Sequence, residues 1–310
     1  ENLYQKEPQS LYDPINYLLK LGGKRARPAM ALMAYELFDK LDDDALNLAM
    51  AIEVFHNFTL MHDDIIDQAD KRRSQPSVHK KYDTNVAILS GDAMMIESYQ
   101  YLAKLSKKDK TISLFTKFNV HALNVCRGQQ YDLEFENQEV VSIEEYLEMI
   151  RLKTAVLVGA AMSLSGELAG ASEEDVQHLQ SFGENIGIAF QLQDDLLDAF
   201  GDPESFGKKV GGDIIQNKKT YLYLKALELA GKEQKKSLLN LYAEKSTDNE
   251  KEKVETVKSI FEALGVKEYT VQLIEAYHNL GISHLQAIKV NPSKKSSLKN
   301  FSDLLMNRKK

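Results

Sequence analysis

The sequence predicts an all-α protein, folded as a single large helical bundle, and three observations favour this class. Apolar residues recur at helical spacing along most of the 310 residues, and no run alternates apolar and polar residues between hairpin turns. Only six prolines interrupt the chain, and 43% of its residues are hydrophobic, which suffices for a sizeable core. Because no shift in composition divides the chain, we expect one domain over residues 1–310.

Periodicity and end signals place the helices in order along the chain. Pro28 suits the first turn of a helix, and Ser142 with Glu145 forms a capping-box pattern at a later helix start. The Gly-Asp-Pro sequence at 201–203 is a stop signal. The expected helices, in order, are 12–21, 28–40, 43–67, 83–105, 109–135, 142–170, 173–200, 217–230, 232–244, 250–264 and 267–289, with a short one at 297–307.

Two of these helices, 43–67 and 173–200, carry apolar residues around most of their circumference, so we expect them to be central. The longest weakly polar run, Ala155 to Leu164, covers only about ten residues, whereas a membrane span needs about twenty. The sequence therefore predicts a core helix there and no transmembrane segment.

Charge and cysteine content narrow the function further. The net charge of −7 argues against a nucleic-acid-binding protein, which usually has a basic surface. Cys126 is the only cysteine, so no intrachain disulfide can form. It lies among apolar residues, and we expect it to be a buried, inert thiol. With no signal-peptide pattern near the start, these features predict a reducing, cytoplasmic location.

Two groups of three aspartates lie where long apolar helices end: Asp63, Asp64 and Asp67 in the first, Asp194, Asp195 and Asp198 in the second. In each group the first and last aspartates share one helix face. The macrodipole disfavours negative charge in a last turn, and like charges one turn apart repel. A divalent cation would resolve this conflict, and carboxylates that tolerate water ligands suit Mg²⁺. Solvated helix ends would explain one such group, but the repetition favours metal binding.

Basic residues concentrate in three turn-like segments, GGKRARP (22–28), DKRR (70–73) and FGKK (206–209). Arginine can bind phosphate with two parallel hydrogen bonds, and lysine acts as a point charge. Since two of these segments follow the aspartate groups closely, the set indicates a site for a diphosphate held by magnesium and by cations.

These motifs resemble those of the trans-isoprenyl diphosphate synthases (polyprenyl synthetases) over nearly the whole chain. The family's markers occur in the family's order: GGKRARP, DDIID followed by RR, GQQYD (128–132), KT (153–154), FQLQDDLLD (190–198), GKKVGGD (207–213) and NKKT (217–220). The one departure is Ser74, where the family commonly has glycine after the two arginines. The resemblance implies the isoprenoid-synthase fold, with helices around a deep central cavity, and a homodimer. It also implies isopentenyl diphosphate and an allylic prenyl diphosphate as substrates.

The resemblance assigns a role to each matching residue. Mg²⁺, three ions per active site with substrate bound, would be held by Asp63, Asp64, Asp67, Asp194, Asp195 and Asp198. The allylic diphosphate would be bound by Arg72, Lys153, Lys208 and Lys218. Isopentenyl diphosphate would be bound by Lys24, Arg27, His56 and Arg73. Thr154 and Gln191 would face the carbocation, and Gln129 and Asp132 would support the metal site. The catalytic set is then Lys153, Thr154, Gln191, Asp63 and Asp194.

The implied reaction is ionisation, condensation and elimination, which yields a short-chain all-trans prenyl diphosphate. We expect the segment 201–217 and the basic tail at 307–310 to help exclude water. Phe58 lies about 7.5 Å before Asp63 along a helix axis. An aromatic residue at this position resembles the pattern of the geranylgeranyl (C20) enzymes of the family. Thr59 and Phe55 would lie beside it at the cavity floor. An ordinary core role for Phe58, and a C15 farnesyl or longer-chain product, are the alternatives.

Three other functions fit parts of the sequence. The His62-Asp63 pair resembles that of HD-type metal phosphohydrolases. Those enzymes need further histidine ligands, and their chemistry would not explain the second aspartate group. Class I terpene cyclases share the fold, but they lack the basic set for isopentenyl diphosphate. A non-catalytic synthase subunit would be expected to have lost aspartates, whereas this chain keeps all six.

Overall fold

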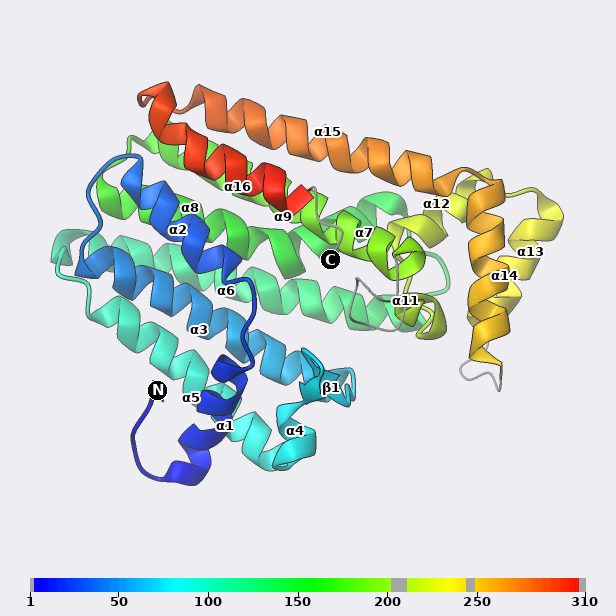
Figure 1. Cartoon of the computed structure of the whole chain (residues 1–310), viewed down its shortest axis with the longest axis horizontal. Coiled ribbons are helices and arrows are strands. Elements are labelled where there is room, and N and C mark those ends of the chain that lie inside the picture. Colours follow the sequence, from blue (N-terminus) through cyan, green and yellow to red (C-terminus); the bar gives the residue numbers. More distant parts are fainter. Residues whose placement is uncertain (1–2, 202–210, 244–248, 307–310) are drawn as a thin grey trace. The chain divides into compact units, whose positions relative to one another are not determined.

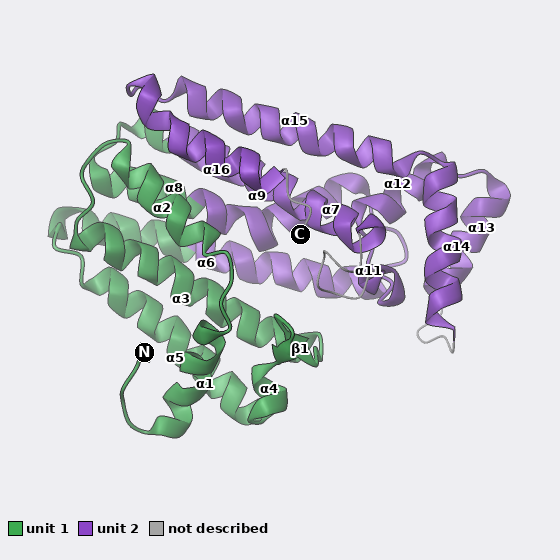
Figure 2. Cartoon of the chain, in the orientation of Figure 1, with its two compact units in different colours: residues 1–119, 160–176 green, residues 120–159, 177–310 purple. Residues whose placement is uncertain are grey.

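The all-α prediction is confirmed by the computed structural model, which describes residues 3–201, 211–243 and 249–306 (Figure 1). Helices make up most of this part of the chain, and its only β structure is one short hairpin. The chain forms two compact units, coloured separately in Figure 2: residues 1–119 with 160–176, and residues 120–159 with 177–310.

The first unit is built around α3, which packs against α2 and α5. Leu48, Ile52 and Phe55 of α3 are each at most 1% exposed, as expected for a central helix. Asp42 starts α3, because its side chain accepts a hydrogen bond from the backbone N–H of Ala45. The unit contains α1 (Gln9–Lys20), α2 (Ala26–Glu36), α3 (Asp43–Ile66), β1 (Lys71–Arg72), β2 (Gln75–Pro76), α4 (Val78–Lys81), α5 (Thr84–Ala103) and the start of α6 (Lys108–Asn137). Most of α8 (Val156–Ala169) and the start of α9 (Glu173–Phe200) also belong to it.

The second unit holds the rest of α6, α8 and α9 and the C-terminal helices. Ser142 and Glu145 form the predicted capping box at the start of α7. The other elements are α7 (Ile143–Ile150), the π-helical turn η1 (Arg151–Ala155), α11 (Gly212–Ile215), α12 (Tyr221–Leu229), α13 (Lys232–Ala243), α14 (Glu250–Ala263), α15 (Val266–Ala287), η2 (Pro292–Lys295) and α16 (Ser296–Met306).

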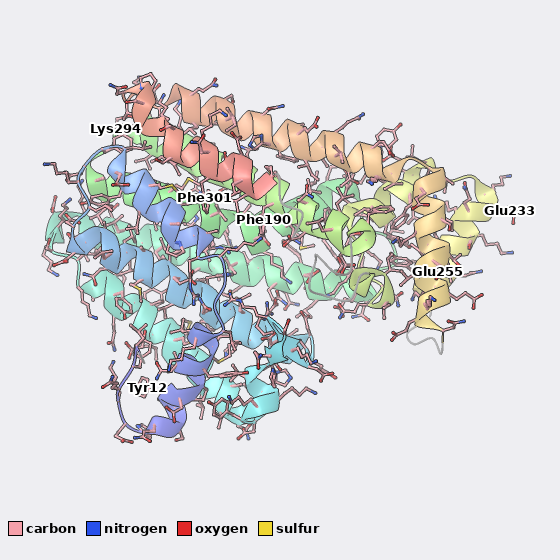
Figure 3. The ribbon with its side chains drawn as sticks, viewed as in Figure 1. Tyr12, Phe190, Glu233, Glu255, Lys294 and Phe301 are labelled. Atoms are coloured by element: carbon pink, nitrogen blue, oxygen red, sulfur yellow. The ribbon has the colours of Figure 1, made fainter. Side chains whose placement is uncertain are left out.

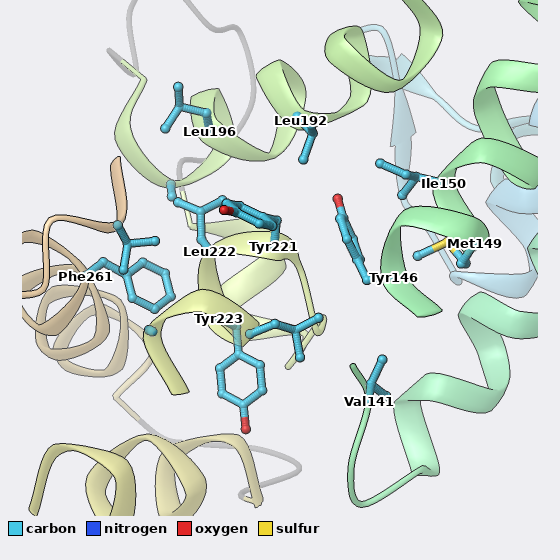
Figure 4. Packing of buried hydrophobic residues seen from close by; sticks show 14 of the residues in the cluster. Val141, Tyr146, Met149, Ile150, Leu192, Leu196, Tyr221, Leu222, Tyr223 and Phe261 are labelled. Carbon is cyan, nitrogen blue, oxygen red and sulfur yellow. The ribbon is translucent and has the colours of Figure 1, made fainter. Parts of the chain in front are cut away.

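One hydrophobic cluster forms the core of the second unit, and Figure 4 shows part of it. It joins Tyr146 of α7, Leu192 and Leu196 of α9, Leu222 of α12 and Phe261 of α14, all of which are buried. The Tyr146 ring lies within this apolar packing, and its hydroxyl points toward α9 (Figure 4). The core therefore fixes the segment of α9 that carries the second aspartate group.

Several features differ from the sequence predictions. The expected helix 142–170 is divided by the π-helical turn of η1. The hairpin at 71–76 was not predicted, because strands of two residues cannot show an alternating pattern. The prediction that Cys126 is buried is wrong, since its side chain lies on an exposed position of α6. In the described part of the chain, no helix is long and apolar enough to cross a membrane.

Candidate active site

The first aspartate group ends α3. Asp63 is half-buried and Asp67 is exposed, whereas Asp64 is only 1% exposed. Both Asp64 oxygens accept hydrogen bonds from Arg72, whose Nε lies 3.0 and 3.1 Å from them and whose Nη2 lies 2.6 Å from Oδ1. Burial raises the pKa of Asp64, and Arg72 opposes this shift. The middle carboxylate of the group therefore orients Arg72 close to the two outer carboxylates.

The hairpin after α3 brings Arg72 back to that helix end. Arg72 pairs with Gln75 across the hairpin, and Arg73 and Ser74 form its turn with φ angles of 53° and 65°. A left-handed backbone costs a non-glycine residue about 1–2 kcal/mol. Strain of this kind is retained where the surrounding structure imposes it, which occurs most often at functional sites.

A third left-handed residue, Arg25 with φ 49°, lies in the basic loop before α2. Its guanidinium donates to the carboxylate of Glu53 and, at 2.5 Å, to the carbonyl oxygen of Leu19. Glu53 also accepts from Nδ2 of Asn57, at 2.9 Å. These partly buried contacts fix the loop against α3, so the loop presents the exposed Lys24 in a defined position.

Arg27 and His56 form a pair in the same unit, with Nη1 and Nε2 3.1 Å apart. A guanidinium can only donate, so His56 Nε2 is the acceptor and the imidazole is neutral. Burial lowers the pKa of His56 well below its usual value, and Arg27 and Arg73 add to this. Nη1 of Arg73 is buried without a hydrogen-bond partner in the described part of the chain. This concentration of positive charge fits an anionic ligand.

We expect the stability of the free protein to fall as the pH drops below about 6.5, partly because of His56. The unfolded chain takes up a proton there, whereas the folded imidazole, with its lowered pKa, does not. His56→Gln keeps an acceptor for Arg27 but cannot titrate. The midpoint of thermal unfolding should therefore depend less on pH between 5.5 and 7.5 in the variant than in the wild type. Equal slopes would contradict the assignment.

The π-helical turn η1 carries Lys153 and Thr154 in the second unit. Gly128 of α6 lies against it so closely that a Cβ there would come within 2.2 Å of the Lys153 nitrogen. A π-turn inserts a residue into a helix and is found most often at functional sites. Gly128, the first residue of the GQQYD motif, therefore permits the close contact between α6 and this turn.

A chain of hydrogen bonds links η1 to the second aspartate group. The Thr154 hydroxyl donates to Oε1 of Gln191 at 3.1 Å, and Nε2 of Gln191 donates to Oδ1 of Asp195 at 2.9 Å. The other oxygen of Asp195 accepts from the Tyr146 hydroxyl. Burial raises the pKa of Asp195 to about 7, although both donors oppose the shift. Sequence reasoning missed Tyr146, because a single tyrosine on an amphipathic helix gives no functional signal.

Lysines surround Asp132 of the same motif. Lys153 Nζ lies 2.7 Å and Lys218 Nζ 3.6 Å from Oδ2 of Asp132, and Lys218 also contacts Glu136 at 2.7 Å. Burial alone would raise the pKa of Asp132, but the two lysines lower it. Next to this cluster in sequence, Nε2 of Gln129 is buried and has no hydrogen-bond partner in the described chain.

The remaining carboxylates of the second group are half-buried. Oδ2 of Asp198 accepts a hydrogen bond from the backbone nitrogen of Asp213, at 3.0 Å. Across the described residues, no three aspartate, glutamate, histidine or cysteine side chains converge into a preformed metal site. This donor set still fits Mg²⁺, which keeps several water ligands and usually takes only one or two carboxylates besides phosphate oxygens.

The predicted chain-length residues lie on α3. Phe58 is 9% exposed, and its ring packs edge-on against Phe55 and His62, with centroids 5.4 and 4.9 Å away. Phe55 in turn packs against Phe118 at 5.3 Å. The Thr59 hydroxyl donates to the carbonyl oxygen of His56. Phe58 thus belongs to an aromatic cluster one to two turns before the first aspartate group.

Some predictions fall outside the described residues. Lys208, most of the segment 201–217 and the tail 307–310 lie there. Hydrogen bonds and ion pairs join several of the predicted residues that the structure does describe: Asp64 with Arg72; Arg27 with His56; Thr154, Gln191 and Asp195 with Tyr146; and Lys153 and Lys218 with Asp132.

Comparison with known proteins shows which family has these features. The family model described as Polyprenyl synthetase matches residues 8–263. A geranylgeranyl diphosphate synthase from Sulfolobus acidocaldarius is 36% identical over 97% of this chain and 91% of its own length. A geranylfarnesyl diphosphate synthase from Natronomonas pharaonis is 39% identical over 73% of this chain and 71% of its own.

A solved structure agrees with these relatives. The crystal structure of a geranylgeranyl pyrophosphate synthase is 47% identical and has a TM-score of 0.94, over 99% of this chain and 94% of that one. The ordered motifs, the all-α fold and the range matched by the family model all indicate the same family. This chain belongs to the polyprenyl synthetase family.

Proposed function

We propose that this chain is a Mg²⁺-dependent prenyltransferase that condenses isopentenyl diphosphate with an allylic diphosphate to give all-trans geranylgeranyl diphosphate, a C20 product. One observation carries the proposal. In each aspartate group the middle carboxylate is buried and accepts from protein donors, whereas the outer carboxylates are at least partly exposed. The outer pair is exposed enough to reach a metal, and the middle residue orients a substrate-binding side chain.

Each residue then has a physical task. Asp63, Asp67 and Asp194 would bind Mg²⁺ directly. Asp64 would act through Arg72 and Asp195 through Gln191, while Asp198 would act partly through water. For the allylic diphosphate we propose Arg72, Lys153, Lys208 and Lys218. For isopentenyl diphosphate we propose Lys24, Arg27, His56 and Arg73, which share an excess of positive charge in the first unit.

The reaction follows from these charges. Asp63, Asp67 and Asp194 would hold Mg²⁺, which would supply positive charge opposite the departing diphosphate. Arg72 and the two lysines beside Asp132 bind the same diphosphate, so the allylic C–O bond can ionise. The Thr154 hydroxyl donates a hydrogen bond to Oε1 of Gln191, so the lone pairs of the threonine oxygen would face the carbocation. The isopentenyl double bond attacks that carbocation, and the released diphosphate accepts the final proton.

The chain would act as one domain, with a deep apolar cavity for the prenyl chain. The single family match across both units supports that reading. We place Phe58, with Phe55 and Thr59, at the cavity floor. The geranylgeranyl names of several relatives favour C20, while the geranylfarnesyl relatives make a longer product the main alternative to C15.

A homodimer is also part of the proposal. Leu89 and Ile96 are exposed apolar side chains seven residues apart on α5, and Val120 and Leu123 are exposed on α6. Apolar stripes on helices of this length favour burial against a second subunit. Light scattering should give twice the chain mass. The single cysteine supports a reducing, cytoplasmic location.

One assay separates the candidate functions. The protein is incubated with Mg²⁺, isopentenyl diphosphate and dimethylallyl or farnesyl diphosphate, and the products are chromatographed. We expect a C20 diphosphate. A cyclised hydrocarbon would indicate a terpene cyclase, phosphate release from nucleotides a phosphohydrolase, and no turnover a non-catalytic subunit.

A further inference from the structure

The first turn of α14 contains a buried lysine. Lys253 is 3% exposed, whereas Lys251, two residues earlier, has a side chain that is 88% exposed. A cation in the first helical turn is opposed by the macrodipole, and burial of an ammonium group costs free energy unless polar groups receive it. Both effects disfavour lysine at this position, so its presence calls for a specific partner.

Asn217 is one such partner. Nζ of Lys253 donates to Oδ1 of Asn217 at 2.5 Å and lies 5.8 Å from the centroid of the Tyr242 ring. Asn217 has a left-handed backbone with φ 58°, which asparagine tolerates better than most residues. The left-handed conformation is still uncommon for asparagine, and the hydrogen bond from Lys253 holds its side chain in place.

The next residue of α14 holds the other end of the same segment. Gly211 has φ 85°, and a Cβ there would lie 2.7 Å from Cγ1 of Val254. The Gly211 nitrogen donates to the carbonyl oxygen of Asp198 at 2.7 Å. Two consecutive residues of α14 therefore contact the segment 211–217 at its two ends, and the segment is also bonded to the second aspartate group.

Lys218 follows directly. Its backbone nitrogen donates to the carbonyl oxygen of Asp213 at 2.9 Å, and its Nζ contacts Glu136 and Asp132. The turn at Asn217 determines the direction in which the chain enters Lys218. A change in that turn would displace the ammonium group from the cluster around Asp132.

We infer that Lys253 is a positioning residue for the allylic diphosphate: through Asn217 it fixes the segment 211–217 and hence the direction of Lys218. The inference rests on the proposed function, because it assigns Lys218 to that diphosphate. It gives α14, a helix with none of the family's acidic motifs, a defined part in substrate binding. The opposite side of α14 carries the exposed pair Lys251 and Glu255, the latter labelled in Figure 3.

The test compares Lys253→Met with Lys251→Met, which removes a charge from the exposed side of the same helix. We expect Lys253→Met to raise KM for the allylic diphosphate about tenfold or more. A displaced Lys218 would lose its hydrogen bond to the charged diphosphate, and a loss of that kind has this size. KM for isopentenyl diphosphate should stay within about twofold, since its proposed ligands lie on other elements. Lys251→Met should leave both values unchanged.

A second variant isolates the hydrogen bond. Asn217→Gly removes the acceptor but keeps a backbone that accepts positive φ. It should reproduce the effect of Lys253→Met, and the double variant should be no worse than either single one. If Lys253→Met does not fold, Asn217→Gly still tests the inference. Lys253→Arg, which keeps a charged donor, should recover part of the affinity.

Three results would overturn the inference: an unchanged KM for the allylic diphosphate, an equal rise in both KM values, or additive effects in the double variant. If the wild type forms no elongated product, the proposed function fails separately. Binding of inorganic pyrophosphate with Mg²⁺, measured by calorimetry, then decides the positioning role. Weaker binding by Lys253→Met than by Lys251→Met supports it, and equal binding rejects it.

Discussion

Asp63→Ala and Asp194→Ala each lower kcat by about a thousandfold or more, while the protein stays folded. Each variant would remove a carboxylate that we propose as a direct Mg²⁺ ligand, so negative charge on the departing diphosphate would no longer be compensated. The fold should persist, because both residues are half-buried, and Asp63 lies in the last turn of α3, where the macrodipole disfavours carboxylates. The rate of product formation, the helical circular dichroism signal and the midpoint of thermal unfolding without metal test this expectation.

Asp64→Ala is the matched contrast to Asp63→Ala. The residues are neighbours, but Asp64 is 1% exposed and binds Arg72. Its removal leaves a largely buried guanidinium without its carboxylate, which should lower the free energy of unfolding by about 3 kcal/mol. Asp64→Ala should therefore lower both activity and the unfolding midpoint, whereas Asp63→Ala should lower activity alone. A comparable loss of stability in Asp63→Ala would make that residue structural.

Sequence reasoning could predict most of the fold, because the helices are long and their apolar faces repeat many times. Helix α9 begins and ends where the pattern predicted, and α3 ends one residue earlier than expected. The turn at 71–76 could not be predicted, since Arg73 and Ser74 are unusual residues for a left-handed turn. The π-helical turn η1 was also invisible, because one inserted residue barely shifts the helical periodicity.

The candidate site also contains some residues that sequence reasoning could find and others that it could not. The aspartates could be found because their charges occur where helix electrostatics disfavours them, and the basic loops because their charges are concentrated and two of them follow the aspartates closely. Their partners could not be found from local sequence. Tyr146 lies 49 residues from Asp195, and Asn217 lies 36 residues from Lys253. Such contacts depend on tertiary packing, which also explains why the exposure of Cys126 was predicted wrongly.

Phe58→Ala lengthens the product beyond C20 if Phe58 forms the cavity floor. Phe58 lies one to two turns before Asp63, and its ring is held between Phe55 and His62. Truncation to alanine removes this ring, so a growing prenyl chain could extend past the C20 length before product release. The measurement is chromatography of the products made from farnesyl diphosphate and isopentenyl diphosphate.

Phe118→Ala is the control for Phe58→Ala. Phe118 is fully buried in the same aromatic cluster, against Phe55, but it lies on α6 rather than on the helix that ends in the first aspartate group. Both variants should lose about 3–5 kcal/mol of stability through the space they leave. Only Phe58→Ala should change the product. If both variants give the wild-type product, or both lengthen it alike, Phe58 is a general core residue and another side chain limits the chain length.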